Sequence, residues 1–214
     1  APLRQTQAEI ASLRVSVDEV LAGENPDSSG TAASTWLTRA TDLVENLQAI
    51  RLNLLQNNRP VDPVLSAEAH FRSFVSVLNE ATAFNEAIGT ALLTGTGSQS
   101  EQHATTLQRT IGRMELAWQL IDNEISAPLA PEVAEGISAA EEFFRLTYEP
   151  LQLDLFTADT PSSRERVTEA WWQASEAGLM ILSDLQTVLL NSSRSRLEML
   201  VTQAQRSAVL FGLV

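Results

Sequence analysis

The residues best suited to chemistry in this sequence are its two histidines and the carboxylates beside them. His70 follows Glu68 and His103 follows Glu101, each at a spacing of two residues. A di-iron carboxylate bundle needs Glu-x-x-His pairs at a spacing of three, so that both ligands project from one helix face. The chain also has no cysteine, which excludes disulfides, zinc–thiolate sites and iron–sulfur clusters. We therefore predict no metal site and no cofactor.

Catalytic motifs are missing as well. The sequence has no Gly-x-Ser-x-Gly elbow, and Gly95-Thr96-Gly97 is typical of a turn between helices rather than of a phosphate-binding loop. The chain has 14 basic residues, all of them arginines, and 27 acidic residues, which gives a net charge of -13. Such a chain lacks the basic face of a nucleic-acid-binding protein. We predict neither an enzyme nor a nucleic-acid partner.

Polar residues on predicted core faces are more informative. Asn85 falls between Ala81 and Ile88 on the apolar stripe of one predicted helix, and Thr147 falls on the stripe of another. A buried polar group without a partner costs about 1–3 kcal/mol, so each needs a reason to be there. Counting from the predicted turns places four residues in one layer, about 15 Å below the end of the helices and bordered by Tyr148. These four residues are Asn85, Arg109, Thr147 and Trp171.

Two interpretations of this layer stay open. A mostly apolar cavity with a few convergent polar groups is the usual ligand site between helices. The candidate ligand-binding residues are then Asn85, Arg109, Arg113, Thr147, Tyr148 and Trp171. In the structural interpretation, Asn85 sets the register of the helices and Trp171 fills the core. Arg109 and Arg113 lie off the apolar stripe, so they are then solvated or salt-bridged.

The helices that must position these residues follow from apolar side chains spaced alternately three and four apart. Six such stripes occupy residues 3–20, 36–54, 67–92, 107–125, 133–151 and 167 to the C-terminal end. Pro131 suits a first helical turn, and Pro150 predicts a kink or an early end within the fifth helix. The sixth helix can exceed fifty residues, about 75 Å. No stretch alternates long enough to predict a strand.

The predicted fold is therefore all-α, an antiparallel bundle of about six helices within a single region, 1–214. One long bundle and two stacked four-helix bundles that share the C-terminal helix both fit the helix lengths. In the second arrangement, 1–63 would pack with 187–214 near a membrane, and 64–186 would form the distal part.

Two further features of the last helix bear on function. The polar run 191–196 interrupts its apolar stripe, which fits a solvated stretch, a second cavity or a dimer contact. The final residues, 207–214, are almost entirely apolar, as expected for the first turns of a membrane helix or for a helix that docks on the core. Antiparallel helices in even number bring both chain ends together, so two membrane helices could flank this region.

Four short stretches also carry a resemblance to a known family: 47–55, 112–118, 139–144 and the tryptophan-bearing 169–172. In order and spacing they resemble the periplasmic double-bundle sensory region of bacterial methyl-accepting chemotaxis receptors, related to nitrate- and nitrite-sensing domains. The resemblance implies a homodimeric periplasmic domain of an inner-membrane receptor that binds a small molecule, with an anion as one option. Related domains often carry arginines where residues 79–89 have none, so the resemblance does not identify the ligand.

A second hypothesis comes from another class of protein, a membrane-anchored helical bundle that only spaces, dimerises or binds a partner protein. A tight and fully apolar core around Asn85 and Trp171 would favour this hypothesis, whereas an occupied or open polar cavity there would favour ligand sensing.

Overall fold

The computed structural model describes Val15, Ile50 and residues 60–94, 98–124, 128–157 and 161–212. Contacts within the chain divide it into two units, 1–58 and 59–214. In the first unit only Val15 and Ile50 are described, both helical and exposed, so the helices predicted at 3–20 and 36–54 lie outside the described residues. The described ranges are helical apart from short connections and contain no strand, which confirms the all-α prediction.

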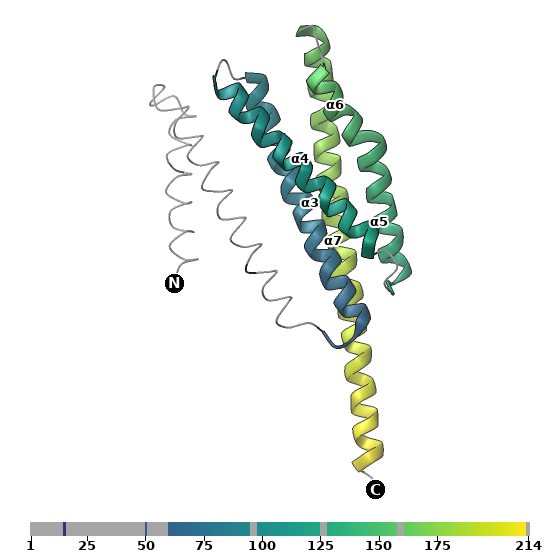
Figure 1. Cartoon of the computed structure of the whole chain (residues 1–214). Coiled ribbons are helices and arrows are strands. Elements are labelled where there is room, and N and C mark those ends of the chain that lie inside the picture. The colour runs from purple at the N-terminus through teal and green to yellow at the C-terminus, as the bar shows by residue number, and fades with distance from the viewer. Residues whose placement is uncertain are drawn as a thin grey trace. The chain divides into compact units, whose positions relative to one another are not determined.

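Helices α3 (Pro63–Thr94) and α4 (Ser98–Glu124) pack side by side (Figure 1). Asp62 caps the start of α3, because its Oδ1 accepts hydrogen bonds from the backbone N–H groups of Val64 and Leu65, both at 3.1 Å. Pro63 follows in the first turn, where its missing N–H costs nothing. The start after Asp62 and the end before Gly95 agree with the predicted bounds.

The fifth predicted helix is continuous but changes type along its length. It comprises α5 (Pro131–Phe143), a π-helical turn η2 (Phe144–Tyr148) and α6 (Glu149–Thr157). Pro131 occupies the first turn as predicted. The helix continues through Pro150 and remains packed in the core. The π turn ends just before this proline, and the N–H of Glu149 donates a hydrogen bond to the carbonyl of Phe144, five residues earlier.

This π turn shifts the buried face of the helix by one residue. The buried positions Val133, Ile137, Ala140 and Phe144 follow the predicted stripe. Beyond them the stripe continues at Tyr148, Gln152 and Leu155. A π turn contains an extra residue compared with an α turn, so every later side chain is rotated relative to the α-helical expectation.

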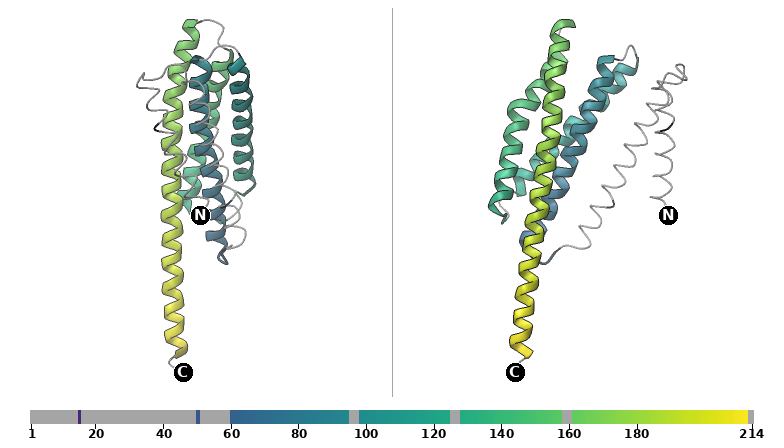
Figure 2. Two further views of the ribbon diagram at one scale, coloured as in Figure 1. Left: turned by 90° about the vertical axis from the view of Figure 1, so that its left-hand side faces the viewer. Right: turned by 180° about the vertical axis from the view of Figure 1, so that it is seen from behind.

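Helix α7 (Pro161–Gly212) has 52 residues, about 78 Å at ~1.5 Å per residue, which confirms the predicted long helix. It packs against α3 along one side and against α5, η2 and α6 along another. Its C-terminal part extends alone beyond the other described helices (Figure 2), and residues 201–207 are all exposed. Among the described residues, no helix contains a stretch long and apolar enough to cross a membrane.

One apolar core joins the described helices of this unit. Large side chains with almost no exposed surface come from five of these elements: Phe71 and Leu78 from α3, Trp118 and Ile121 from α4, Ile137 from α5, Phe144 from η2, and Leu182 and Leu189 from α7. Aromatic rings continue this core towards the polar layer, since the Trp118 and Tyr148 rings lie 5.6 and 5.1 Å from that of Phe144.

Candidate functional site

Four polar side chains are buried together where α3, η2 and α7 meet. They are Asn85 from α3, Tyr148 from η2, and Trp171 and Ser175 from one face of α7, and we call them the Tyr148 layer. All four residues have no exposed surface. Burial raises the pKa of the Tyr148 hydroxyl, and hydrogen bonding from the side chains of Asn85, Ser175 and Trp171 lowers it in part, so these three polar groups lie close around it.

Apart from this close approach to the Tyr148 hydroxyl, four polar atoms of the layer make no hydrogen bond of good geometry to the described residues. These atoms are Oδ1 of Asn85, the hydroxyl oxygens of Tyr148 and Ser175, and Nε1 of Trp171. Native proteins leave few buried polar groups unpaired, and each such group needs an explanation, such as a bound water or ligand. Four such atoms in one layer can pair in part among themselves, and they are also the buried polar groups best placed to pair with a ligand.

Other buried hydroxyls in the same helices show that pairing is readily available. Thr82 Oγ1 donates to the carbonyl of Leu78 at 2.8 Å, and Thr110 Oγ1 donates to that of Thr106 at 3.0 Å. Both use the carbonyl four residues earlier, a partner open to any helical serine or threonine. The Ser175 hydroxyl makes no such bond. It lies close to the Tyr148 hydroxyl instead, where it partly offsets the rise in pKa that burial causes.

The walls of the layer are tightly packed. A Cβ atom built on Gly89 would lie 2.6 Å from Cζ3 of Trp171, so the indole packs directly on the backbone of α3. On the other side of Asn85, its Nδ2 donates to Sδ of Met114 at 3.1 Å. Because a thioether sulfur only accepts, this contact orients the amide and leaves Oδ1 as the free acceptor.

Burial dominates the electrostatics of the layer. It raises the pKa of Tyr148 to about 12, and the Glu86 carboxylate adds to this rise, while Asn85, Ser175 and Trp171 oppose it. Burial also raises the pKa of Glu86, and the nearby charge of Glu176 raises it further. None of the groups that act on the pKa of Tyr148 is basic. The layer is thus desolvated and bordered by acidic groups.

The structure brings together three of the predicted site residues, Asn85, Tyr148 and Trp171, and all three are fully buried. The predicted placement of Thr147 on the core face is wrong, because the π turn rotates it outward and Tyr148 takes the inward position. The role of the three residues in ligand binding stays a prediction.

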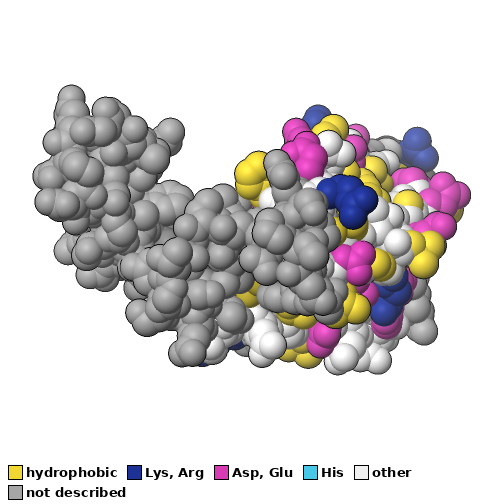
Figure 3. Space-filling view, turned by 90° about the horizontal axis from the view of Figure 1, so that it is seen from above, with side chains coloured by type: hydrophobic (Ala, Val, Ile, Leu, Met, Phe, Trp, Pro, Cys, Tyr) yellow, Lys and Arg dark blue, Asp and Glu magenta, His cyan; other side chains and the backbone are white. Residues whose placement is uncertain are grey.

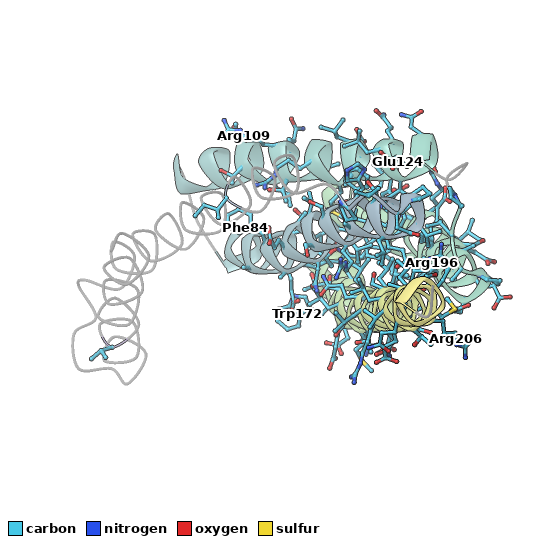
Figure 4. The ribbon with its side chains drawn as sticks, turned by 90° about the horizontal axis from the view of Figure 1, so that it is seen from below. Phe84, Arg109, Glu124, Trp172, Arg196 and Arg206 are labelled. Carbon is cyan, nitrogen blue, oxygen red and sulfur yellow. The ribbon has the colours of Figure 1, made fainter. Side chains whose placement is uncertain are left out.

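The two predicted arginines lie away from the layer. Arg109 is exposed on the outer side of α4, and its side chain points away from the other helices (Figure 4). Arg113 is half-buried one turn further along the same helix and has an interaction of its own. This agrees with their position off the apolar stripe of α4.

Sequence reasoning missed Ser175. The available signal was its position one turn after Trp171, beside the small residues Ala174 and Gly178. Gly178 does not leave an open space, since a Cβ there would lie 3.1 Å from Cζ of Phe144. Two more buried polar atoms without partners, Nε1 of Trp118 and Nε2 of Gln152, occur on α4 and α6.

A second buried polar cluster lies lower on the same two helices. Glu68 of α3 is fully buried, and its two carboxylate oxygens accept hydrogen bonds from the hydroxyls of Ser192 and Ser193 on α7, both at 2.6 Å. We call these three residues the Glu68 clasp. The serines belong to the polar run 191–196, so at these two positions the run is not a solvated stretch.

An ion pair continues the contact between α3 and α7 below the clasp. Arg196 donates to Asp62 at 2.8 Å, and this lowers the pKa of that carboxyl together with the backbone donors at the start of α3. A hydrogen bond joins α3 to α4, with Nδ1 of His70 3.1 Å from Oε1 of Glu124. No group of three or more potential metal ligands occurs among the described residues. Acidic, basic and apolar side chains are interspersed over the described end shown in Figure 3.

Comparisons with known proteins add no relative: no protein-family model, no curated protein and no solved structure matches the chain.

Proposed function

We propose that this chain is the extracytoplasmic sensory domain of a bacterial transmembrane receptor, a chemoreceptor in the first instance, that binds a small molecule. In this proposal the domain is periplasmic and non-catalytic, and it is an antiparallel bundle of about six helices next to membrane helices outside this sequence. The helices form either one long bundle or two stacked bundles. In the second arrangement, 1–63 pack with 187–214 near the membrane, and 64–186 form the part away from it.

One observation carries this proposal: the unpaired polar atoms of the Tyr148 layer. A core that served only as a spacer would gain stability from apolar side chains here, since each unpaired buried group costs about 1–3 kcal/mol. Asn85, Tyr148, Trp171 and Ser175 instead leave four polar atoms without partners. A ligand that pairs with them recovers this energy on binding.

The long α7 helix offers a route for the signal. It supplies two residues of the layer, Trp171 and Ser175, and continues to Gly212, well beyond the other described helices. A ligand that contacts α3, η2 and α7 together favours one packing of α7 against its neighbours. It can shift this equilibrium only by the difference between its affinities for the two packings.

A thermal-shift screen of small metabolites tests the proposal. A true ligand at a hundred times its dissociation constant stabilises the domain by ~2.7 kcal/mol. We expect at least one such ligand, and we expect its effect to vanish in Ser175→Leu, which fills the layer, but not in the control Thr147→Leu on the exposed face. A broad screen without any ligand, or a ligand insensitive to Ser175→Leu, would refute sensing at this layer.

A protein-interaction bundle is the second candidate, favoured by apolar side chains exposed on the lower half of α7. They are Leu190, Leu197, Met199 and Val201, each more than half exposed. A second copy of the chain is the partner that the homodimer hypothesis requires. Sedimentation of the wild type and of Leu197→Glu with Val201→Glu tests it: a wild-type dimer that the double variant dissociates supports it, and a wild-type monomer contradicts it.

A further inference from the structure

We propose that the Tyr148 layer binds an uncharged small molecule that carries both a hydrogen-bond donor and an acceptor, such as a primary amide or an alcohol. This inference rests on the proposed function, because it concerns the same site. It adds the chemical class of the ligand, which the resemblance to anion-sensing domains leaves undetermined.

The polar inventory of the layer requires both a donor and an acceptor. Nε1 of Trp171 can only donate, so it needs a ligand acceptor. Oδ1 of Asn85 can only accept, so it needs a ligand donor. The hydroxyls of Tyr148 and Ser175 can do either and can therefore adapt to the ligand.

An anion does not satisfy this inventory. A carboxylate or nitrate has no donor for Asn85 Oδ1, and it enters a desolvated site where the one charged group that acts on Tyr148 is the Glu86 carboxylate. Transfer of an unpaired charge into such a site is very unfavourable. The two arginines that could neutralise an anion lie elsewhere, Arg109 exposed on α4 and Arg113 in an interaction of its own.

A cation fits no better. An ammonium group offers no acceptor to Nε1 of Trp171. Burial of its charge in the desolvated layer is costly as well, as for an anion. An uncharged ligand avoids both desolvation costs and can pair with all four polar atoms.

Packing around the layer limits the size of the group that enters. The backbone of α3 at Gly89 closes directly on the Trp171 ring, and Phe144 fills the space beside Gly178. A compact head group, such as an amide or a hydroxymethyl, therefore fits this layer better than a branched or aromatic one.

Three nearly isosteric probes test the inference: acetamide is neutral, acetate is anionic and acetamidinium is cationic. The readout is the indole N–H signal of Trp171 in two-dimensional NMR, assigned with Trp171→Phe. Trp172 is 41% exposed and projects from the surface of α7 (Figure 4), so its signal serves as an internal control. Ligands of this size bind weakly, so the titration extends to about 50 mM.

We expect acetamide to move the Trp171 signal saturably and to leave the Trp172 signal in place. The dissociation constants of acetate and acetamidinium should be at least about tenfold higher than that of acetamide. Ser175→Ala should weaken acetamide binding, and the control Thr147→Val on the exposed face should not. Acetate or acetamidinium binding as tightly as acetamide would overturn the ligand class and leave sensing at this layer intact. If no probe moves the Trp171 signal, the layer holds only water and the inference is wrong; if the metabolite screen also finds no ligand, the proposed function fails with it.

Discussion

Helices α3 and α7 are joined by two buried polar clusters that differ in how well they are paired. In the Glu68 clasp, both carboxylate oxygens accept a hydroxyl at 2.6 Å. In the Tyr148 layer, four polar atoms on the same two helices and on η2 have no partner. The hydrogen bonds of the clasp are complete and short, whereas the four groups of the layer only approach one another around the Tyr148 hydroxyl. Pairing, rather than burial or polarity, separates a structural cluster from a candidate binding site in this molecule.

The contacts around the clasp extend this difference along the helices. Arg196 pairs with Asp62 below it, and Gln186 Nε2 donates to Ser76 Oγ at 3.3 Å above it. These contacts join residues of α3 and α7 in one antiparallel register and oppose sliding of one helix past the other. Closer to the layer the contact is Gly89 against Trp171, an apolar contact without a directional bond.

The largest effect should come from breaking the clasp. Glu68→Ala removes two charge-assisted hydrogen bonds and leaves two buried hydroxyls unpaired, so we expect a loss of about 3 kcal/mol in the free energy of unfolding. Urea denaturation measures it. Glu198→Ala is the matched control, since its pair with Arg194 lies on the surface, and it should cost less than about 0.5 kcal/mol. Equal effects of the two variants would show that the clasp does not hold α3 to α7.

Alkaline pH should then destabilise the protein through Tyr148. Its pKa is about 12 in the folded protein and 10.0 ordinarily, so the unfolded chain loses this proton first. The stabilisation is complete below pH ~10 and is lost as pH rises towards ~12, at a total cost of about 2–3 kcal/mol.

The sequence makes this measurement clean, because Tyr148 is its single tyrosine and no lysine titrates in the same window. Absorbance of the phenolate gives the pKa directly, and denaturation at several pH values gives the stability. Tyr148→Phe should remove the dependence between pH ~10 and ~12. A phenolate midpoint near the ordinary value would mean that the hydroxyl is solvated and that the layer is not closed.

Two helical glycines should respond in opposite directions. Gly89→Ala pushes a methyl group into the buried Trp171 ring and should cost about 1–3 kcal/mol. Gly112→Ala, with nothing within 4 Å of its new Cβ, should gain about 0.5–1 kcal/mol from better helix propensity. Thermal denaturation of both variants decides the matter. A neutral Gly89→Ala would mean that the wall of the layer yields to a methyl group.

The smallest single effect, that of Ser175→Ala, belongs to the most direct comparison of the two clusters. Ser192→Ala and Ser175→Ala delete the same hydroxyl from the same helix, paired in the clasp and unpaired in the layer. We expect Ser192→Ala to cost about 1.5 kcal/mol and Ser175→Ala to be neutral or slightly stabilising. Denaturation without ligand measures both. Equal costs would show that Ser175 has a partner after all, and the distinction between the clusters would disappear.

The sequence predicted the helices of the described unit well, because apolar spacing is a local signal. The bounds of α3, the first turn of α5 at Pro131 and the length of α7 agree with it. The same spacing found Asn85 and Trp171 on inward faces. The pairing of the first two predicted helices with the rest falls outside the described residues and stays a prediction.

The errors and omissions arose where the answer is not local. Thr147 was placed inward by a constant period of 3.6, which the π turn breaks. Glu68 was considered only as a metal ligand beside His70, because its partners lie on a helix more than 120 residues away. The run 191–196 was visible as polar, but only the packing shows that Ser192 and Ser193 face inward. Local patterns place a side chain on a face, while its partner depends on the tertiary structure.

The π turn also changes how this helix should respond to insertions and deletions. One extra residue in η2 sets α6 about 100° out of phase with a continuous α-helix. Deleting a single residue from Phe144–Tyr148 would restore that phase and rotate the whole of α6, so that a different set of its side chains would meet α7. The length of this segment, and not only its composition, therefore determines whether the tyrosine hydroxyl reaches the layer.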